Sequence, residues 1–460
     1  MLVRYWIAVL IAVTWLPVVA AQDLRAGRSA VKITPPKGMP MAGYYHVRLN
    51  EGVHDDLFSK ALVLEVNGER AALVALDLVS APRPLVEAAR KQIQERSGLP
   101  PERIMISATH SHTGPEMGGR LRGVDPATEK LAKDYHGKLP GLIAESVARA
   151  IADLQPVRAR VGVGQEDAVA FIRRFRMQDG TVGWNPGKLN PKIVHPMGSI
   201  DPAVPVVYFE SPDRKPLLTY VNYANHLDTV GGIEFSADYP YTIGRMLADV
   251  RGPDMVTMFT IGTAGNINHI DVKNGEPQKG HSEAARIGTT LAGEVLRTFR
   301  HMKAVSPGPV RAKSRVIVLP KSHYDPADVA KAREVVSRYG KPGADPFYTQ
   351  VHSFKVLDLE ARGSEPLEAE VQVISLGQEI AWVGLPGEIF VEHGKAIKLA
   401  SPFPVTIIAE LANGSLGYVP DRRAYAEGAY EVISARVGPG AGEQLVAEAV
   451  KQLVDAYNGR

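Results

Sequence analysis

Two histidines separated by one residue follow an apolar segment, in the stretch Ala108-Thr-His110-Ser-His112-Thr-Gly-Pro115. Residues i and i+2 of an extended chain point to the same side. Imidazole is the commonest metal ligand, and it titrates near neutral pH. Loops at strand ends are also where α/β sheets bind their ligands. The pattern therefore indicates either a metal or catalytic site or a pair of hydrogen-bonded loop histidines.

Four further apolar segments end in polar residues of the same kinds. They are followed by His226 with Asp228, by Gly265-Asn-Ile-Asn268-His269, by Glu388 after Leu385-Pro-Gly, and by Tyr418 with Tyr425 and Tyr430 downstream. Each alone is explained by a structural histidine, a turn, a carboxylate in the first turn of a helix, or a packed tyrosine. Taken together, two His and one Glu form a known three-ligand zinc set that leaves a position for water. The sequence thus predicts a metal site built from distant segments.

The elements that must position these residues alternate between hairpins and strand–helix pairs. Asn67-Gly68 between apolar segments predicts a hairpin over 60–78, and a second hairpin is predicted over 371–383. Further strands are predicted at 103–108, 159–163, 216–223, 255–261 and 406–409. Helices are predicted at 84–96, 126–153 (interrupted near 137–140), 241–250, 284–302, 327–338 and 442–457. Residues 303–330 read as a connector, and 179–202 and 340–347 as long loops. This mixture predicts a layered α/β fold, with mixed sheets flanked by helices in one large domain.

Composition excludes several classes of function. Hydrophobic residues make up 45% of the chain and charged residues 22%, which is too apolar for a disordered protein. The 53 basic and 50 acidic residues nearly balance, and the basic clusters are no longer than pairs, so nucleic acid is not an expected partner. The chain has no cysteine, so any metal must be held by His, Asp, Glu or Tyr.

The first residues have the features of a secretory signal. Arg4 is followed by an apolar run over 5–19 and by the small residues Ala20-Ala21. A basic end, a short apolar core and a small-residue cleavage site are typical of such signals, and the run is shorter than a bilayer requires. We expect residues 1–21 to be removed near Ala21 and the mature chain to be exported to the periplasm or the medium.

In this order, the segments resemble the N-terminal catalytic domain of the neutral, non-lysosomal ceramidases, over about 25–436. The most specific pieces are the Thr109-His-Ser-His-Thr-Gly-Pro115 segment, Pro386-Gly-Glu388, and the stretch from Gly417-Tyr418 to Tyr430-Glu431. The resemblance implies that residues 22–460 form a catalytic domain without the family's C-terminal immunoglobulin-like domain. It also implies hydrolysis of the amide of N-acyl sphingosine, a lipid-like substrate that makes peripheral membrane contact an expectation.

Carried over by position, the resemblance implies one Zn²⁺ held by His110, His226, Glu388 and Tyr418. His112 would lie beside the metal as a hydrogen-bond or acid/base partner. Arg173 would bind near the substrate carbonyl, and Tyr430 would contact the scissile amide. Carboxylates are expected to orient the ligating imidazoles, and the candidates are Asp228 and the pair Asp55-Asp56.

The chain departs from the family pattern at two places. Asn268 stands where the family has a serine, and Asp238-Tyr-Pro-Tyr replaces the family's Asp-Asn-Lys-Gly stretch. Because the metal set is kept better than the substrate-contacting set, metal-dependent hydrolysis is a firmer expectation than ceramide as the substrate. A zinc enzyme acting on another N-acyl amide or an ester, and an exported binding protein whose site has decayed, remain alternatives.

A serine hydrolase is a further alternative. Ser415 lies in Asn413-Gly-Ser-Leu-Gly417. The nucleophile-elbow pattern requires a glycine where this chain has Asn413, so the zinc interpretation is favoured.

Overall fold

Three units of the same topology follow one another in the computed structural model, which describes residues 23–117, 124–341 and 343–460. In each unit three strands pair antiparallel in succession, and a helix then leads into a fourth strand parallel to the third. Another helix follows the fourth strand. No sequence repeat accompanies this repetition of topology.

The units are made of the following elements. The first contains β1 (Leu24–Lys32), β5 (Phe58–Val66), β6 (Glu69–Leu76), α1 (Arg83–Ser97), β7 (Ile104–Ala108) and α2 (Pro126–Ala152). The second contains β9 (Arg158–Gln165), β14 (Ala203–Glu210), β15 (Pro216–Tyr223), α3 (Tyr239–Arg251), β17 (Val256–Ile261) and α4 (His281–Thr298). The third contains β20 (Val310–Leu319), β21 (Leu367–Leu376), β22 (Ile380–Gly384), α7 (Val391–Ala400), β24 (Val405–Ala409) and α10 (Ala441–Tyr457).

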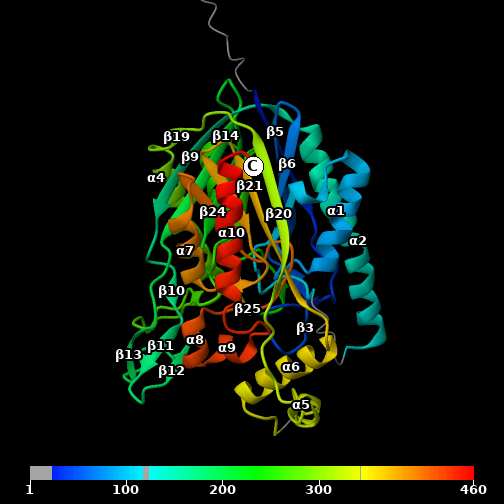
Figure 1. Ribbon diagram of the computed structural model, residues 1–460, viewed down its shortest axis with the longest axis vertical. Coiled ribbons are helices and arrows are strands. Elements are labelled where there is room, and N and C mark those ends of the chain that lie inside the picture. The colour runs from blue at the N-terminus through cyan, green and yellow to red at the C-terminus, as the bar shows by residue number, and fades with distance from the viewer. Residues whose placement is uncertain (1–22, 118–123, 342) are drawn as a thin grey trace, which may run out of the picture.

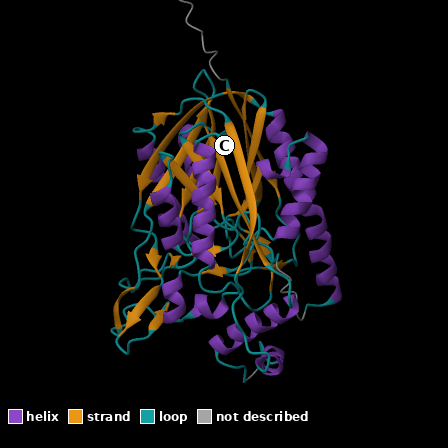
Figure 2. Ribbon diagram, viewed as in Figure 1, coloured by secondary structure: helices purple, strands orange, loops and turns teal. Residues whose placement is uncertain are grey.

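The three sheets have matching strand orders. They run β7-β6-β5-β1, β17-β15-β14-β9 and β24-β22-β21-β20, and the short strands β8 (Gln155–Pro156) and β19 (Lys303–Ala304) extend the first two. One hydrophobic cluster draws buried side chains from all three sheets, among them Leu64, Tyr220 and Trp382. Three other clusters join the sheets to the helix pairs α1/α2, α3/α4 and α7/α10. Strands therefore occupy the interior and helices the outside (Figure 2).

The topology brings particular chain segments to one end of the molecule. Because the second and third strands reverse direction in turn and the fourth runs parallel to the third, the third and fourth strands end where the first strand ends. In each unit a long connection leaves the first strand at this same end and returns to the second. We call residues 33–57, 166–202 and 320–366 the three long connections; they lie at the bottom of Figure 1.

The long connections contain their own short elements. The first holds β2 (Pro40–Met41), β3 (Arg48–Leu49) and β4 (Gly52–Val53), and β4 pairs with β16 (Glu234–Phe235). The second holds β10 (Phe171–Ile172), β11 (Arg174–Met177), β12 (Val182–Trp184) and β13 (Ile193–Pro196). The third holds α5 (Asp328–Ser337) and α6 (Phe347–Arg362). The remaining short elements are η1 (Pro101–Arg103), β18 (Ile267–Asn268), β23 (Glu388–Ile389), β25 (Tyr418–Val419), α8 (Arg422–Glu427) and α9 (Tyr430–Ser434).

The predicted mixed α/β fold is confirmed, and most predicted elements are present. The first hairpin turns at Asn67 and Gly68, whose φ angles of 53° and 82° are those its two-residue turn requires. Two expectations are wrong. The predicted interruption of the helix over 126–153 is absent, because α2 continues through Pro140 with Leu139 and Ile143 buried against the first sheet. The predicted connector at 303–330 contains β20, an edge strand whose charged residues hide its strand pattern.

The predicted loops at 179–202 and 340–347 are also partly structured, since they include β12, β13 and the start of α6. The predicted signal over 1–21 lies outside the described residues. Over the part of the chain that the structure describes, no helix combines the length and the apolarity needed to cross a membrane.

Candidate metal centre

His110 and His226 meet at the end of the molecule where the strands of the first and second units end. His110 follows β7 and His226 follows β15, and both side chains are buried. Their Nε2 atoms lie 3.1 Å apart. His110 has a φ of 76°, a left-handed conformation that costs a non-glycine residue about 1 kcal/mol or more. Such strain is characteristic of functional sites, and the hydrogen bond from His110 N–H to Leu78 O, 2.9 Å long, helps to maintain it here.

Main-chain carbonyls fix the orientation of both rings. His110 Nδ1 lies 2.8 Å from Val79 O, and His226 Nδ1 lies 3.0 Å from Ala264 O. A carbonyl can only accept, so each Nδ1 carries the proton and donates it. In the neutral rings the two Nε2 lone pairs then face each other at close range, an arrangement that a shared cation stabilises. Burial, followed by the charge of Arg173, lowers the pKa of His226 and favours the neutral ring.

Glu388 adds a carboxylate from the third unit. Its Oε2 lies 3.5 Å from Nε2 of both His110 and His226. This oxygen is buried and has no hydrogen-bond partner among the described residues. Although burial alone would raise it, contacts with His110 and His226 hold the pKa of Glu388 well below its usual range. An ionised, unsatisfied carboxylate oxygen beside two imidazole lone pairs is a donor set that fits Zn²⁺.

Tyr418 lies beside Glu388 because their two short strands are paired. Glu388 in β23 and Tyr418 in β25 are direct partners in a parallel ladder. Gly265 makes room for this ladder, since a Cβ at residue 265 would lie 2.4 Å from the main-chain oxygen of Glu388. Tyr418 is buried; that burial raises the pKa of its phenol well above the usual range, and the negative charge of the nearby Glu388 acts in the same direction.

His112 also faces the cluster. Its Nε2 lies 3.2 Å from Nε2 of His110, so the rings of His110, His112 and His226 are close enough to share one ion. Burial, with the charge of His110 second, lowers the pKa of His112 well below its usual value. His112 is therefore both a neighbour of the metal position and a further candidate ligand.

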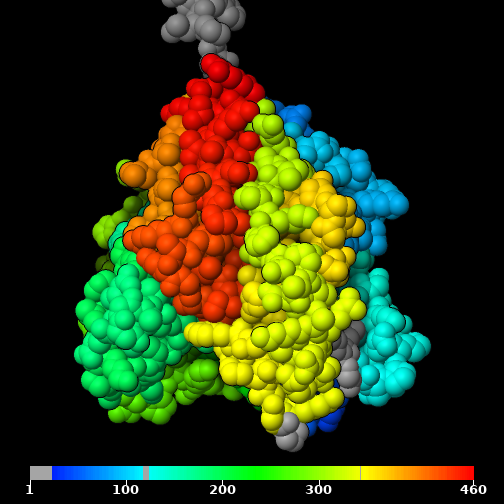
Figure 3. All heavy atoms as spheres, turned by 60° about the horizontal axis from the view of Figure 1, so that its bottom comes forward, coloured from blue at the N-terminus to red at the C-terminus, as the bar shows by residue number. Residues whose placement is uncertain are grey.

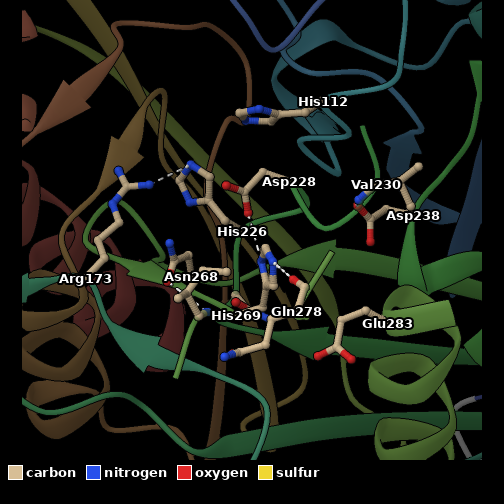
Figure 4. Close-up of polar contacts among 12 residues, drawn as sticks. His112, Arg173, His226, Asp228, Val230, Asp238, Asn268, His269, Gln278 and Glu283 are labelled. Atoms are coloured by element: carbon tan, nitrogen blue, oxygen red, sulfur yellow. Dashed lines mark hydrogen bonds and ion pairs between the residues drawn. The ribbon is translucent and has the colours of Figure 1, made fainter. Parts of the chain in front are cut away.

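Arg173 is a fixed, buried cation on the opposite side of His226 from His112 (Figure 4). Its Nε donates to Glu431 Oε1 at 2.9 Å and its Nη2 to Gly265 O at 2.7 Å. Its Nη1 lies 3.4 Å from His226 Nε2, and its guanidinium lies 5.2 Å from the ring centroid of Tyr418. Burial alone would lower the pKa of Arg173, but Tyr418 and Glu431 raise it overall.

Tyr430 and Asn268 belong to two segments that contact the Arg173 segment. The Tyr430 ring lies 5.4 Å from that of Tyr418, and burial raises the pKa of its phenol well above the usual range. Asn268 pairs with Phe171 in a two-stranded sheet. Its Nδ2 donates to Asn185 Oδ1 at 2.9 Å and its Oδ1 accepts from Ile270 N at 3.1 Å, so both amide atoms already have partners.

Asp228 pairs with His269, a strand-end histidine to which the sequence assigned no specific role. Its Oδ1 lies 3.1 Å from His269 Nδ1, and His269 Nε2 lies 2.7 Å from Gln278 O (Figure 4). Two acceptors on one imidazole require both ring nitrogens to donate, so His269 is a buried imidazolium. Although burial acts in the opposite direction on each group, their attraction raises the pKa of His269 and holds that of Asp228 well below its usual value.

The carboxylates expected to orient the ligating imidazoles do not do so. Val79 O and Ala264 O have that role, whereas Asp228 binds His269. Asp55 accepts from Ser236 Oγ and Ala237 N, and Asp56 accepts from Thr34 Oγ1.

Glu410, directly after β24, was missed by the sequence reasoning. It is fully buried, and burial raises its pKa well above the usual range. Its Oε2 accepts from Ile389 N at 2.7 Å and from Ala264 N at 3.2 Å, so it links the segment of Glu388 to the carbonyl that orients His226. Its place after a strand was the available signal, but a single Glu among aliphatic residues did not separate it from a surface carboxylate.

Ser415 is exposed in the loop between β24 and β25. A nucleophile elbow requires a sharp strand-to-helix turn, so this position does not fit the serine-hydrolase alternative.

Comparison with known proteins gives similarity of structure alone. No protein-family model and no curated protein sequence matches the chain. The crystal structure of neutral ceramidase from Pseudomonas aeruginosa matches with a TM-score of 0.73 at 20% identity, covering 95% of this chain and 75% of that one. A structure described as a ceramidase complexed with C2 matches with a TM-score of 0.72 at 18% identity, covering 95% and 76%. The chain therefore has the fold of these ceramidases.

Proposed function

We propose that this protein is an exported zinc-dependent hydrolase that cleaves the amide of N-acyl sphingoid lipids with water, giving a fatty acid and an amine. The observation that carries the proposal is the convergence of His110 Nε2, His226 Nε2 and the unpartnered Glu388 Oε2, with the histidine protons directed to the main chain. The fold shared with neutral ceramidases supports amide hydrolysis over other zinc chemistry.

His110, His226, Glu388 and Tyr418 would hold the ion, with His112 at its edge. Bound zinc supplies a Lewis acid that lowers the pKa of its bound water to about 7. The protein's own contribution is a fixed donor geometry. The carbonyls of Val79 and Ala264 hold the two imidazoles, the ladder between β23 and β25 holds Glu388 beside Tyr418, and Glu410 links these segments.

The side chains around the ion suggest how the amide lies. His226 lies between Arg173 and His112 in Figure 4. We place the substrate carbonyl towards the Arg173 guanidinium and the Tyr430 hydroxyl, which would donate to the oxygen as negative charge develops on it. The amide nitrogen then lies towards His112, whose Nε2 would accept a proton from the attacking water and pass it to the leaving amine. Removing one such oxyanion donor typically costs about a hundredfold to a thousandfold in rate.

Asn268 has a supporting role in this scheme. It stands where the related family has a serine, but its amide atoms bind Asn185 and the Ile270 main chain. Through its pairing with Phe171 it would hold the segment that carries Arg173.

The test is an assay of purified, zinc-replete protein on a panel of N-acyl sphingoid lipids, other N-acyl amides and esters, with and without chelator. We expect chelator-sensitive hydrolysis of the sphingoid amides and one zinc per chain. His110→Ala should lose both metal and activity while keeping most of its thermal stability. His301→Ala, at an exposed histidine beyond α4, is the matched control and should keep both.

Other outcomes would replace the proposal with a named alternative. Chelator-sensitive cleavage of only other amides or of esters indicates a zinc hydrolase of different specificity. Absence of both zinc and hydrolysis, with tight binding of the same lipids, indicates a binding protein. Export with cleavage near Ala21 is checked by the N-terminal sequence of the protein recovered outside the cytoplasm.

A further inference from the structure

Aromatic rings lead from the candidate metal centre to the surface. Tyr430 lies 5.4 Å from Tyr418, 4.3 Å from Trp184 and 5.7 Å from Phe347, measured between ring centroids. Tyr45 lies 5.8 Å from Phe347. Tyr45, Trp184 and Phe347 come from the first, second and third long connections. Each long connection thus contributes one of these rings to a continuous aromatic cluster, which also includes Tyr418 and Tyr430, and the cluster reaches solvent at Phe347, which is 43% exposed.

Exposed apolar side chains gather on the same three connections. Seven of the fifteen large hydrophobic residues that are most exposed lie there, although the connections make up about a quarter of the chain. The seven are Val47, Leu49, Val53, Leu189, Val194, Phe347 and Tyr348. An eighth, Ile233, belongs to the loop after His226 and is held beside the first connection by a 2.8 Å hydrogen bond from Glu51 N to its oxygen. Apolar groups therefore surround the end of the molecule that contains the site.

Charge does not explain this surface. Over the three connections, Lys plus Arg and Asp plus Glu are equal in number. An anionic surface would be met by an excess of basic residues, each contributing about 1 kcal/mol near a charged membrane. The side chains are also carried on separate lobes, and Figure 3 shows the lobe of β11–β13 and the lobe of α5 and α6 with a notch between them. A flat protein partner fits such separate protrusions poorly, whereas a fluid lipid layer accommodates them.

We propose that the three long connections form a docking surface for a layer of zwitterionic lipids, which carries no net charge. Leu189, Val47 and Tyr348 enter the layer from three sides of the site, and the aromatic cluster offers an apolar path from the layer to the metal centre. Tyr and Trp suit this place because their rings are amphipathic and favour membrane interfaces. The delivery of substrate along this path rests on the proposed function, but the docking itself does not require hydrolysis.

The test is sedimentation of the full-length protein with phosphatidylcholine vesicles. The docking variant carries Val47→Ser, Leu189→Ser and Tyr348→Ser, one change in each connection. The control variant carries Val250→Ser, Val318→Ser and Leu399→Ser, three exposed apolar residues outside the connections. All proteins have the same N-terminus, so any binding by the first residues is common to them. We expect the docking variant to lose about tenfold in vesicle partitioning, the control to match wild type, and added phosphatidylserine to change binding less than about twofold.

Equal partitioning of the docking variant and wild type would overturn the proposal, as would an equal loss in the control. The proposal would also be overturned if wild type stays in solution and elutes as a dimer while the docking variant elutes as a monomer. That result would indicate a contact between copies of this chain. Unchanged melting temperatures verify that the variants are folded. If the triple docking variant does not fold, the single variant Leu189→Ser tests the same surface with a smaller change. Hydrolysis of a water-soluble N-acetyl amide is measured in parallel; its absence in wild type would count against the proposed function, while the vesicle result decides the docking.

Discussion

The strand ends and the long connections build the two sides of the same site in different ways. His110, His226 and Glu388 follow core strands, and their positions are set by main-chain hydrogen bonds and by the ladder between β23 and β25. Arg173, Trp184 and Phe347 come from connections and are placed mainly by side-chain contacts with distant segments. Under the proposed function, the strand ends would fix the metal, whereas the connections would determine which substrate reaches it and how it is oriented.

The largest effect is expected at a strand end. Glu388→Gln removes the negative charge beside two imidazoles while keeping the size of the side chain. Metal affinity should fall steeply, and hydrolysis should fall by about a thousandfold or more, because the metal's chemistry is lost with it. Zinc analysis after dialysis and turnover on the best substrate measure this. Retention of full zinc and activity would show that the strand ends do not define the metal site.

Arg173→Lys should distinguish metal binding at the strand ends from substrate orientation by the connections. The lysine keeps a positive charge but loses the planar fork that reaches Glu431, Gly265 and the substrate together. We expect kcat to fall about a hundredfold with zinc content unchanged. Arg176→Lys, three residues further along the same connection, is the control. Loss of zinc in Arg173→Lys would mean that this connection also maintains the metal site.

A smaller effect concerns the buried pair of His269 and Asp228. The pKa of His269 is raised in the folded protein, so its protonation contributes stability that is fully present below about pH 6.5 and is lost as the pH rises through the folded value. In chelator-treated protein, the melting temperature of wild type should decline relative to that of the double variant Asp228→Asn/His269→Gln from pH 6 to 9, by about 1 to 2 °C. Parallel melting curves would show that His269 is not a buried cation.

The smallest effect is expected in the aromatic cluster. Phe347→Leu keeps an apolar side chain but removes one ring that stacks on Tyr430 and Trp184. KM for a long-chain substrate should rise about threefold, as expected for losing part of an aromatic contact, with kcat and zinc content kept. A change in kcat alone would place this residue in the chemistry rather than in substrate access.

The part of the site formed by the strand ends was more predictable from the sequence than the part formed by the long connections. Apolar segments ending in His110, His226 and Glu388 marked it, because strand ends are both recognisable and the usual place for ligands. Glu410 could not be separated from an exposed carboxylate, since burial depends on packing that one sequence does not reveal. The role of His269 depends on Gln278 O and Asp228 lying on either side of it, which is also a tertiary property.

The connections and the threefold topology were less predictable. The charged edge strand β20 resembled a connector, and the third connection contains a helix, α6, that was not predicted; only its first residue, Phe347, lay in the predicted loop over 340–347. Without β20 the third unit lacks its first strand, so its likeness to the other two was hidden. The partner of each aromatic ring lies in a different unit, and no spacing within one segment indicates that contact.

The most direct measurement is a crystal structure of zinc-replete protein with anomalous diffraction at the zinc edge. The account predicts one ion bonded to Nε2 of His110 and of His226 and to a carboxylate oxygen of Glu388, at about 2.0–2.2 Å each. It would be contradicted by an anomalous peak elsewhere, or by zinc-replete crystals in which these three side chains bind no ion.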